Sequence, residues 1–176
     1  DEDVSIYKTP KGLSLEIVDE ISSQKNEPLF MKEYREKSYK EFIKHHQPSF
    51  GPDLSFLNFD DYTYFTRLSD KVSKKWEDVP ETVRNTFSKL GIPEAEKEFL
   101  AGVSTQYESE AVYHNMLKEV EDKGVIFLDT DTALKTHPEL FKKYFGKLVP
   151  YTDNKYAALN GCCWSGGSFI YIPKGV

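Results

Sequence analysis

Two adjacent cysteines, Cys162 and Cys163, are the side chains in this sequence with the clearest capacity for chemistry. Thiolates bind zinc and iron–sulfur clusters, but a self-contained site of that kind uses spaced cysteines such as Cys-x-x-Cys. On a strand, which the surrounding residues predict, neighbouring side chains point to opposite faces, so only one thiol could face a given site. We therefore expect one buried cysteine that packs as a small apolar residue and one exposed thiol, with a metal-ligand pair as the alternative.

The four histidines are scattered, and none has the spacing of a metal-binding helix. His114 follows a predicted strand and lies near Glu110 in the sequence, which suggests a weak acid–base pair. The other three lie where structural roles predominate, at predicted helix ends: His45, His46 and His137. His114 is therefore the histidine that joins Cys162 and Cys163 as a candidate metal or catalytic residue.

Two groups of carboxylates could do acid–base work or bind a cation. Glu108 and Glu110 would share one face of a strand. Asp129 and Asp131 would do the same if their strand continued, but the run from Asp129 to Thr132 more plainly predicts a helix cap. The residues by themselves thus predict no evident active site.

Composition limits the classes of partner. The formal net charge is −6 and basic residues are interleaved with acidic ones, which argues against a nucleic-acid or anionic-membrane partner. Hydrophobic residues make up 39 % and aromatic residues 14 %, so a core can form. No apolar run approaches the roughly 18 residues of a membrane span, and no signal peptide is visible. We expect a cytoplasmic protein.

The first half of the chain reads as helical. Ser14 predicts the N-cap of a helix with an apolar face formed by Leu15, Ile17, Val18 and Ile21. Pro28 predicts the start of a long helix to about His46, with inward candidates Phe30, Met31, Tyr34, Phe42 and Ile43. An irregular aromatic segment follows, over residues 50–65. Two further helices are predicted: one that Gly91 ends, with Val83, Phe87 and Leu90 on its apolar face, and one from Ile92 to about Gly102.

The second half alternates short strands and helices. Residues 103–113 and 125–128 predict strands, and 115–123 predict a helix. Asp131 or Thr132 caps a further helix that restarts at Pro138 and ends at Gly146, with Leu140, Tyr144 and Phe145 facing inward. A short helix around residues 155–159 precedes a glycine turn at 165–167 and a β-forming tail. The fold class is α+β, with a helical N-terminal part and a small α/β unit, and with domains over 1–155 and 156–176.

Several stretches, taken in order, resemble the SufB family of iron–sulfur cluster scaffolds. The resemblance runs from about Leu15 to the end and has the short join after Trp76 that some members show. Its motifs are Lys25–Met31, Leu90–Glu96, Gln106–Glu110, Val112–Asn115, Gly124–Phe127, His137–Leu140, Lys143–Gly146, Ala157–Asn160 and Trp164–Val176. Phe30 stands where the family has tryptophan, and Cys162-Cys163 stands where we expect small or aliphatic residues.

The resemblance implies a non-enzymatic scaffold. It implies that the tail begins a truncated right-handed parallel β-helix, whose partner strands follow Val176. Because the chain starts without methionine and stops directly after a β-forming run, we expect an N-terminal fragment. The implied partners are a SufC-type ATPase, a SufD-type paralogue, a cysteine desulfurase or other sulfur donor, and apoprotein or carrier acceptors. The implied cluster ligands lie beyond residue 176, so no catalytic, cofactor or metal residue is carried over to this chain.

Two other readings stay open. One is a small metal- or thiol-dependent enzyme that uses Cys162, Cys163 and His114. The other is a protein-interaction module that docks a sulfur donor, with the aromatic segment 50–65 as its surface.

Overall fold

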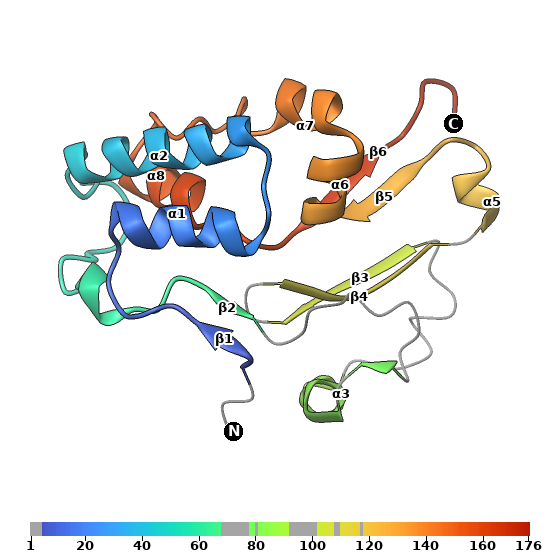
Figure 1. The fold of residues 1–176 in the computed structure, drawn as a ribbon, viewed down its shortest axis with the longest axis horizontal. Helices are drawn as coiled ribbons and strands as arrows, with labels where there is room; N and C mark the ends of the chain where they lie inside the picture. Colours follow the sequence, from blue (N-terminus) through green and yellow to red (C-terminus); the bar gives the residue numbers. More distant parts are fainter. Residues whose placement is uncertain (1–4, 68–77, 80, 92–101, 108–109, 117) are drawn as a thin grey trace. The chain divides into compact units, whose positions relative to one another are not determined.

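The structure is a computed structural model that describes residues 5–67, 78–79, 81–91, 102–107, 110–116 and 118–176. It contains helices and three two-stranded sheets, which confirms the predicted α+β class (Figure 1). The chain divides into two compact units, each built from separate segments. The first unit comprises 1–6, 67–133 and 166–176, and the second comprises 7–66 and 134–165. The predicted domain boundary at residue 155 stays a prediction.

Helices dominate the second unit. It holds α1 (Leu15–Gln24), α2 (Leu29–Lys44), the 3-10 helix η1 (Phe59–Asp61), α7 (Pro138–Tyr144) and α8 (Lys155–Cys163). α1, α2 and α8 pack against one another (Figure 1). Strands β1 (Tyr7–Lys8) and β2 (Thr66–Arg67) form a short sheet that leads into and out of these helices.

Helix α1 forms as its sequence predicts. The Ser14 hydroxyl accepts a hydrogen bond from the backbone of Ile17, which satisfies one of the amides that the first turn leaves unpaired. Ile17, Val18 and Ile21 are buried as expected, whereas Leu15 is exposed. Ile17 and Ile21 pack with the fully buried Phe65, so the aromatic segment 50–65 is fixed to α1 at its end.

Helix α2 begins and ends where predicted, but the prediction of its inward face was partly wrong. Met31 and Phe42 are buried, whereas Ile43 is 62 % exposed. The residues that complete the inward face are polar, Arg35 and Ser38, and both are fully buried. Positions 31, 35, 38 and 42 are three or four residues apart, as on one face of a helix. The sequence pattern favoured both Phe42 and Ile43, but Ile43 lies one position outside this face.

The first unit contains two antiparallel pairs of strands and the helices α3 (Glu81–Lys89) and α5 (Lys118–Glu121). β3 (Gly102–Tyr107) pairs with β4 (Glu110–Met116), so the predicted strand over 103–113 is in fact two strands. β4 also takes up the beginning of the helix predicted from 115. Gly91 follows α3 with a φ of 72°, as its predicted role at the helix end requires. The helix predicted from Ile92 lies outside the described residues.

The terminal strand has a partner within the chain. β6 (Ser168–Tyr171) pairs antiparallel with β5 (Ile126–Asp129), which precedes it, and further partner strands after Val176 stay a prediction. The glycines 166 and 167 therefore connect a helix to a strand and do not form the predicted hairpin turn. No parallel β-helix coil is present among the residues that the structure describes.

Helix α6 (Thr130–Thr136) begins directly after β5. Both carboxylate oxygens of Asp129 accept hydrogen bonds from Thr132, one from its backbone amide at 2.9 Å and one from its hydroxyl at 2.6 Å. Asp129, rather than Asp131 or Thr132, is thus the cap of this helix. The restart at Pro138 is confirmed, but Phe141 is the buried residue of α7 and Tyr144 is 55 % exposed.

Candidate functional site

The two cysteines lie in the last turn of helix α8, not on a strand. Their sulfur atoms are 3.6 Å apart and both thiols are free. Cys162 is fully buried, as expected, whereas Cys163 is half-buried rather than exposed. Because successive residues of a helix are about 100° apart, the two sulfurs lie side by side, contrary to the opposite faces that we predicted.

The helix continues through the cysteines because both its start and its middle are stabilised. The Asn154 side chain accepts hydrogen bonds from the amides of Tyr156 and Ala157, at 2.9 and 3.1 Å. Gly161 is unfavourable in a helix by its propensity, but it lets α8 approach α2 closely. A Cβ atom at this position would lie 2.8 Å from the Cβ atom of Ser38.

A buried ion pair fixes the C-terminal end of α8. The Arg35 guanidinium donates two hydrogen bonds to the Glu27 carboxylate, at 2.6 and 2.7 Å, and both side chains are fully buried. A third hydrogen bond, of 3.0 Å, runs from Arg35 to the backbone carbonyl of Cys162. The Trp164 ring lies against the same guanidinium, 4.7 Å from its central carbon. We call Glu27, Arg35 and the Cys162 carbonyl the clamp.

Lys25 holds the segment that follows α8. Its ammonium donates a 2.5 Å hydrogen bond to the carbonyl of Ser165 and lies 5.8 Å from the ring centres of both Phe65 and Trp164. Asn26 has a φ of 52°, in the left-handed region that asparagine tolerates better than most residues. The motif that begins at Lys25 therefore closes α1, opens α2 and holds the segment after α8.

The environment of Cys163 disfavours the thiolate form that metal ligation or nucleophilic attack requires. The hydrogen bond with Cys162, followed by burial, raises the pKa of Cys163 well above its ordinary value. Thiolates, not thiols, ligate metals and attack electrophiles, so this environment opposes both roles. The Cys162 thiol also donates to the carbonyl of Leu159, at 3.2 Å. Within the described part of the chain, no three His, Cys, Asp or Glu side chains lie close enough together to hold a metal ion.

The remaining candidate residues lie in the first unit, whereas the cysteines lie in the second. His114 is in β4 and pairs with Ser104 of β3, and Glu110 begins β4 opposite Tyr107. Glu108 lies outside the described residues. A joint site of Cys162, Cys163 and His114 therefore stays a prediction.

The raised pKa of Cys163 predicts slow alkylation. At pH 8, the fraction of Cys163 present as thiolate is smaller than for an ordinary cysteine, so iodoacetamide should modify it more slowly than the same residue in the unfolded protein. The rate should keep rising with pH beyond the range near 8.5 where a free cysteine levels off. Mass spectrometry of timed samples measures the rate at each pH.

The Cys162→Ser variant provides the control. Removal of the neighbouring thiol takes away the main cause of the raised pKa, so Cys163 should alkylate faster in this variant. Equal rates in the folded, unfolded and variant proteins would show that the thiol is not held in its protonated form.

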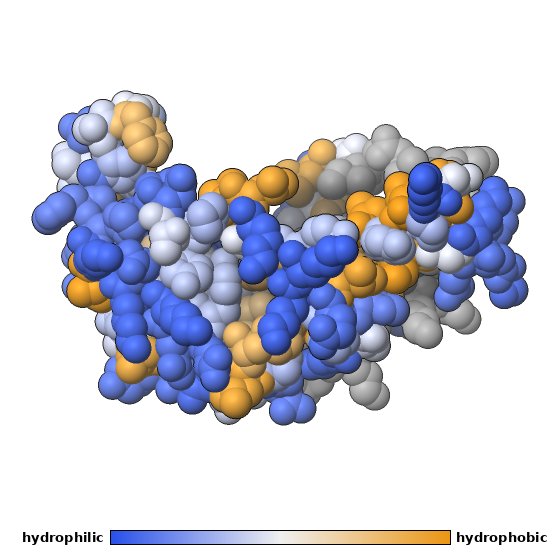
Figure 2. Space-filling model, turned by 90° about the horizontal axis from the view of Figure 1, so that it is seen from above, coloured by the Kyte–Doolittle hydropathy of each residue, from blue (hydrophilic) through white to orange (hydrophobic). Residues whose placement is uncertain are grey.

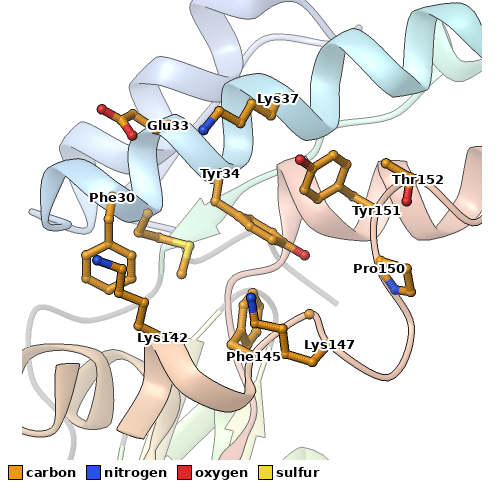
Figure 3. A pocket seen from close by; sticks show the side chains of 12 residues that line it. Phe30, Glu33, Tyr34, Lys37, Lys142, Phe145, Lys147, Pro150, Tyr151 and Thr152 are labelled. Atoms are coloured by element: carbon orange, nitrogen blue, oxygen red, sulfur yellow. The ribbon is translucent and has the colours of Figure 1, made fainter. Parts of the chain in front are cut away.

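A pocket that no sequence pattern indicated lies elsewhere in the second unit. It has a volume of about 500 Å³ and lies between α2 and the segment from Phe145 to Thr152 (Figure 3). Four aromatic side chains and three lysines are among the residues that line it. Residues from α2 and from a segment more than 100 positions later contribute to it, so no local pattern could have predicted it.

The aromatic segment 50–65 divides into buried and exposed residues. Phe65 is fully buried, and Phe59 packs edge-on against Phe42 with ring centres 5.1 Å apart. Phe50 and Phe56 are 69 % and 75 % exposed. The space-filling view likewise shows separate hydrophobic patches on a mostly hydrophilic face (Figure 2).

Among the described residues, no helix combines the length and the apolar character needed to cross a membrane.

Comparison with known proteins gives concordant matches over the chain. The family described as the SufBD protein N-terminal region matches residues 16–176. An iron–sulfur cluster assembly SufBD family protein from Staphylococcus aureus (strain USA300) is 58 % identical over 176 residues. A protein of the same description from Staphylococcus saprophyticus is also 58 % identical. Each alignment covers 100 % of this chain and 38 % of the relative, so the chain spans less than two fifths of the relatives' length.

Proposed function

Because the chain belongs to the SufBD family of iron–sulfur cluster assembly proteins, we propose that it acts as the N-terminal part of a non-catalytic scaffold on which clusters are assembled. The match covers most of the chain and runs through all the motifs on which the resemblance was based. The proposed scaffold is of the SufB type. It works with a SufC-type ATPase and a SufD-type paralogue, receives sulfur from a cysteine desulfurase system and passes the cluster to apoproteins or carriers. Its proposed location is the cytoplasm, without a nucleic-acid or membrane partner.

The proposed scaffold continues into a right-handed parallel β-helix that β6 introduces. Among the described residues, β6 pairs with β5 along one edge only. We propose that the opposite edge of β6 receives a further strand, because an uncovered edge invites association between chains. We propose that β5 and β6 cover the first coil of the β-helix, which protects its open end.

We propose that the cluster is held outside this chain. The observation that supports this is the chemistry of the cysteine pair: Cys162 is buried and donates to a carbonyl, and the pKa of Cys163 is raised. The backbone carbonyl of Cys162 is part of the clamp, so the segment is used to join helices. A cluster requires thiolates or imidazoles at its iron atoms, and the raised pKa of Cys163 opposes formation of its thiolate.

Anaerobic reconstitution tests this proposal. With ferrous iron, sulfide and a thiol reductant, the chain should acquire no stoichiometric absorption in the visible range, whereas the full-length relative from S. aureus should acquire it under the same conditions. Iron and sulfide analysis after desalting gives the stoichiometry. A stable chromophore on the chain that disappears in the Cys162→Ser/Cys163→Ser variant would support the alternative of a small metal- or thiol-dependent protein.

A second candidate function rests on the exposure of Phe50 and Phe56. Exposed aromatic side chains in a loop are typical of binding surfaces. The segment 50–65 could then dock the sulfur donor. Capture of the purified desulfurase by the chain, and its loss in the Phe50→Ser/Phe56→Ser variant, would favour this function.

A further inference from the structure

The pocket of the second unit has an aromatic wall that is already assembled. Tyr34 of α2 lies edge-on to Phe145 and Tyr151, with ring centres 5.4 and 5.1 Å apart. Gly146 has a φ of 66°, and a Cβ atom there would overlap the Tyr34 hydroxyl. The loop conformation and the ring position thus depend on each other, so the aromatic wall is formed before any ligand binds (Figure 3).

Lysines surround this wall. Lys37 comes from α2, Lys142 from α7 and Lys147 from the loop that follows it. Lys142 lies over the Phe30 ring, 5.5 Å from its centre, as Figure 3 shows. Among the described residues, no carboxylate lies within ion-pair distance of these three lysines. Glu33 is the acidic residue that lines the pocket.

This local charge is opposite to that of the whole protein. The formal net charge of the chain is −6, yet three lysines and one glutamate line the pocket. A positive rim around an apolar cavity attracts anions and repels basic partners, and its effect is strongest on the rate of association. The rim therefore selects for negative charge, and the aromatic wall selects for a large apolar group.

We propose that this pocket docks an acidic peptide segment of a partner protein, with one large apolar side chain inserted between Phe30, Tyr34 and Phe145. The lysines come from three different elements, so they match carboxylates spread along an extended chain better than a single compact anion. Single apolar anchors in preformed pockets carry much of the affinity of such interfaces. The proposal does not depend on the scaffold function.

Fluorescence anisotropy with a labelled Asp-Asp-Trp-Asp-Asp peptide tests the proposal on the intact protein. The peptide should bind, and its affinity should fall as salt rises, because exposed charges are screened. Lys37→Glu should weaken binding about tenfold through charge reversal at the rim. Lys40→Glu, an exposed lysine three residues later on the same helix, is the matched control and should have a much smaller effect.

Two comparison ligands and one further variant separate the contributions. Asp-Asp-Ala-Asp-Asp and Lys-Lys-Trp-Lys-Lys should both bind at least tenfold more weakly, since each lacks one of the two features. Phe30→Ala should weaken the tryptophan peptide but not the alanine peptide. Equal affinity for all three peptides, or equal effects of Lys37→Glu and Lys40→Glu, would overturn the proposal. Binding of indole-3-acetate as tight as that of the acidic peptide would overturn it in favour of a small aromatic anion.

Discussion

The Arg35→Ala variant is expected to lose about 3–5 kcal/mol of the free energy of unfolding, because it leaves the Glu27 carboxylate charged, buried and without its partner. The Arg35 guanidinium donates two hydrogen bonds to the Glu27 carboxylate, and both side chains are fully buried. The same substitution removes the hydrogen bond to the Cys162 carbonyl and the contact with Trp164. The single substitution thus weakens the contacts that join α2 to the segment before it and to α8.

Urea unfolding followed by circular dichroism measures this loss. Lys32→Ala is the matched control, because Lys32 lies on the same helix and pairs with Asp19 at 3.2 Å, but both side chains are well exposed. Its effect should be a small fraction of that of Arg35→Ala, since solvent screens an exposed pair.

The Glu27→Met/Arg35→Met double variant distinguishes the cost of an unpaired buried charge from the cost of lost packing. Replacement of a whole buried pair by apolar residues of similar volume is often close to neutral. The double variant should therefore be more stable than Arg35→Ala. A similar loss in Arg35→Ala and Lys32→Ala would contradict the view that the clamp holds these helices together.

The sequence predicted those elements whose signals are local. Ser14 marks the start of α1, Gly91 follows the end of α3 and Pro138 opens α7, and each signal acts through the backbone of its own few residues. Errors arose where tertiary packing decides. The inward face of α2 contains Arg35 and Ser38, so a rule that places apolar residues inside selected the exposed Ile43.

The pairing of the tail with β5 was missed for a similar reason. Residues 168–171 were recognised as a strand, but antiparallel pairing with β5 joins residues about 40 positions apart, and no turn signal specifies that contact. The helix around Cys162 also exceeded its predicted length. Its continuation depends on the contact of Gly161 with α2. A helix-propensity scale counts this glycine only as destabilising.

The candidate site was predictable only in part. One packed cysteine could be expected from residue types alone, and Cys162 confirms it, but the thiol expected to be exposed, Cys163, is half-buried. The physical role of Lys25 and Glu27 could not be expected, because their partners, Ser165 and Arg35, are known only once the helices are packed. Charged residues in a sequence are ordinarily assigned to the surface, and a buried pair leaves no periodic signal.

The Gly161→Ala variant is expected to lose about 1–3 kcal/mol of the free energy of unfolding, the usual cost of overpacking a tight interior. In an isolated helix this substitution stabilises by about 1 kcal/mol, so any net loss reports the contact with α2. An added Cβ atom would lie 2.5 Å from the Ser38 hydroxyl oxygen and 3.1 Å from the Cβ atom of Tyr151. Both neighbours belong to packed segments, so the two helices must separate to make room.

A double-mutant cycle with Ser38→Gly identifies the cause. Without the Ser38 side chain, the Gly161→Ala substitution should cost less, with a coupling energy of about 1 kcal/mol or more. Asn160→Ala, at the exposed neighbouring position of α8, is the control and should change stability by no more than about 0.5 kcal/mol. If Gly161→Ala stabilises the protein to the degree seen in an isolated helix, close approach of α2 and α8 is not what requires glycine there. Since the Cys162 carbonyl lies one residue beyond Gly161, a forced separation should also lengthen its hydrogen bond to Arg35, so Gly161→Ala and Arg35→Ala should be less than additive.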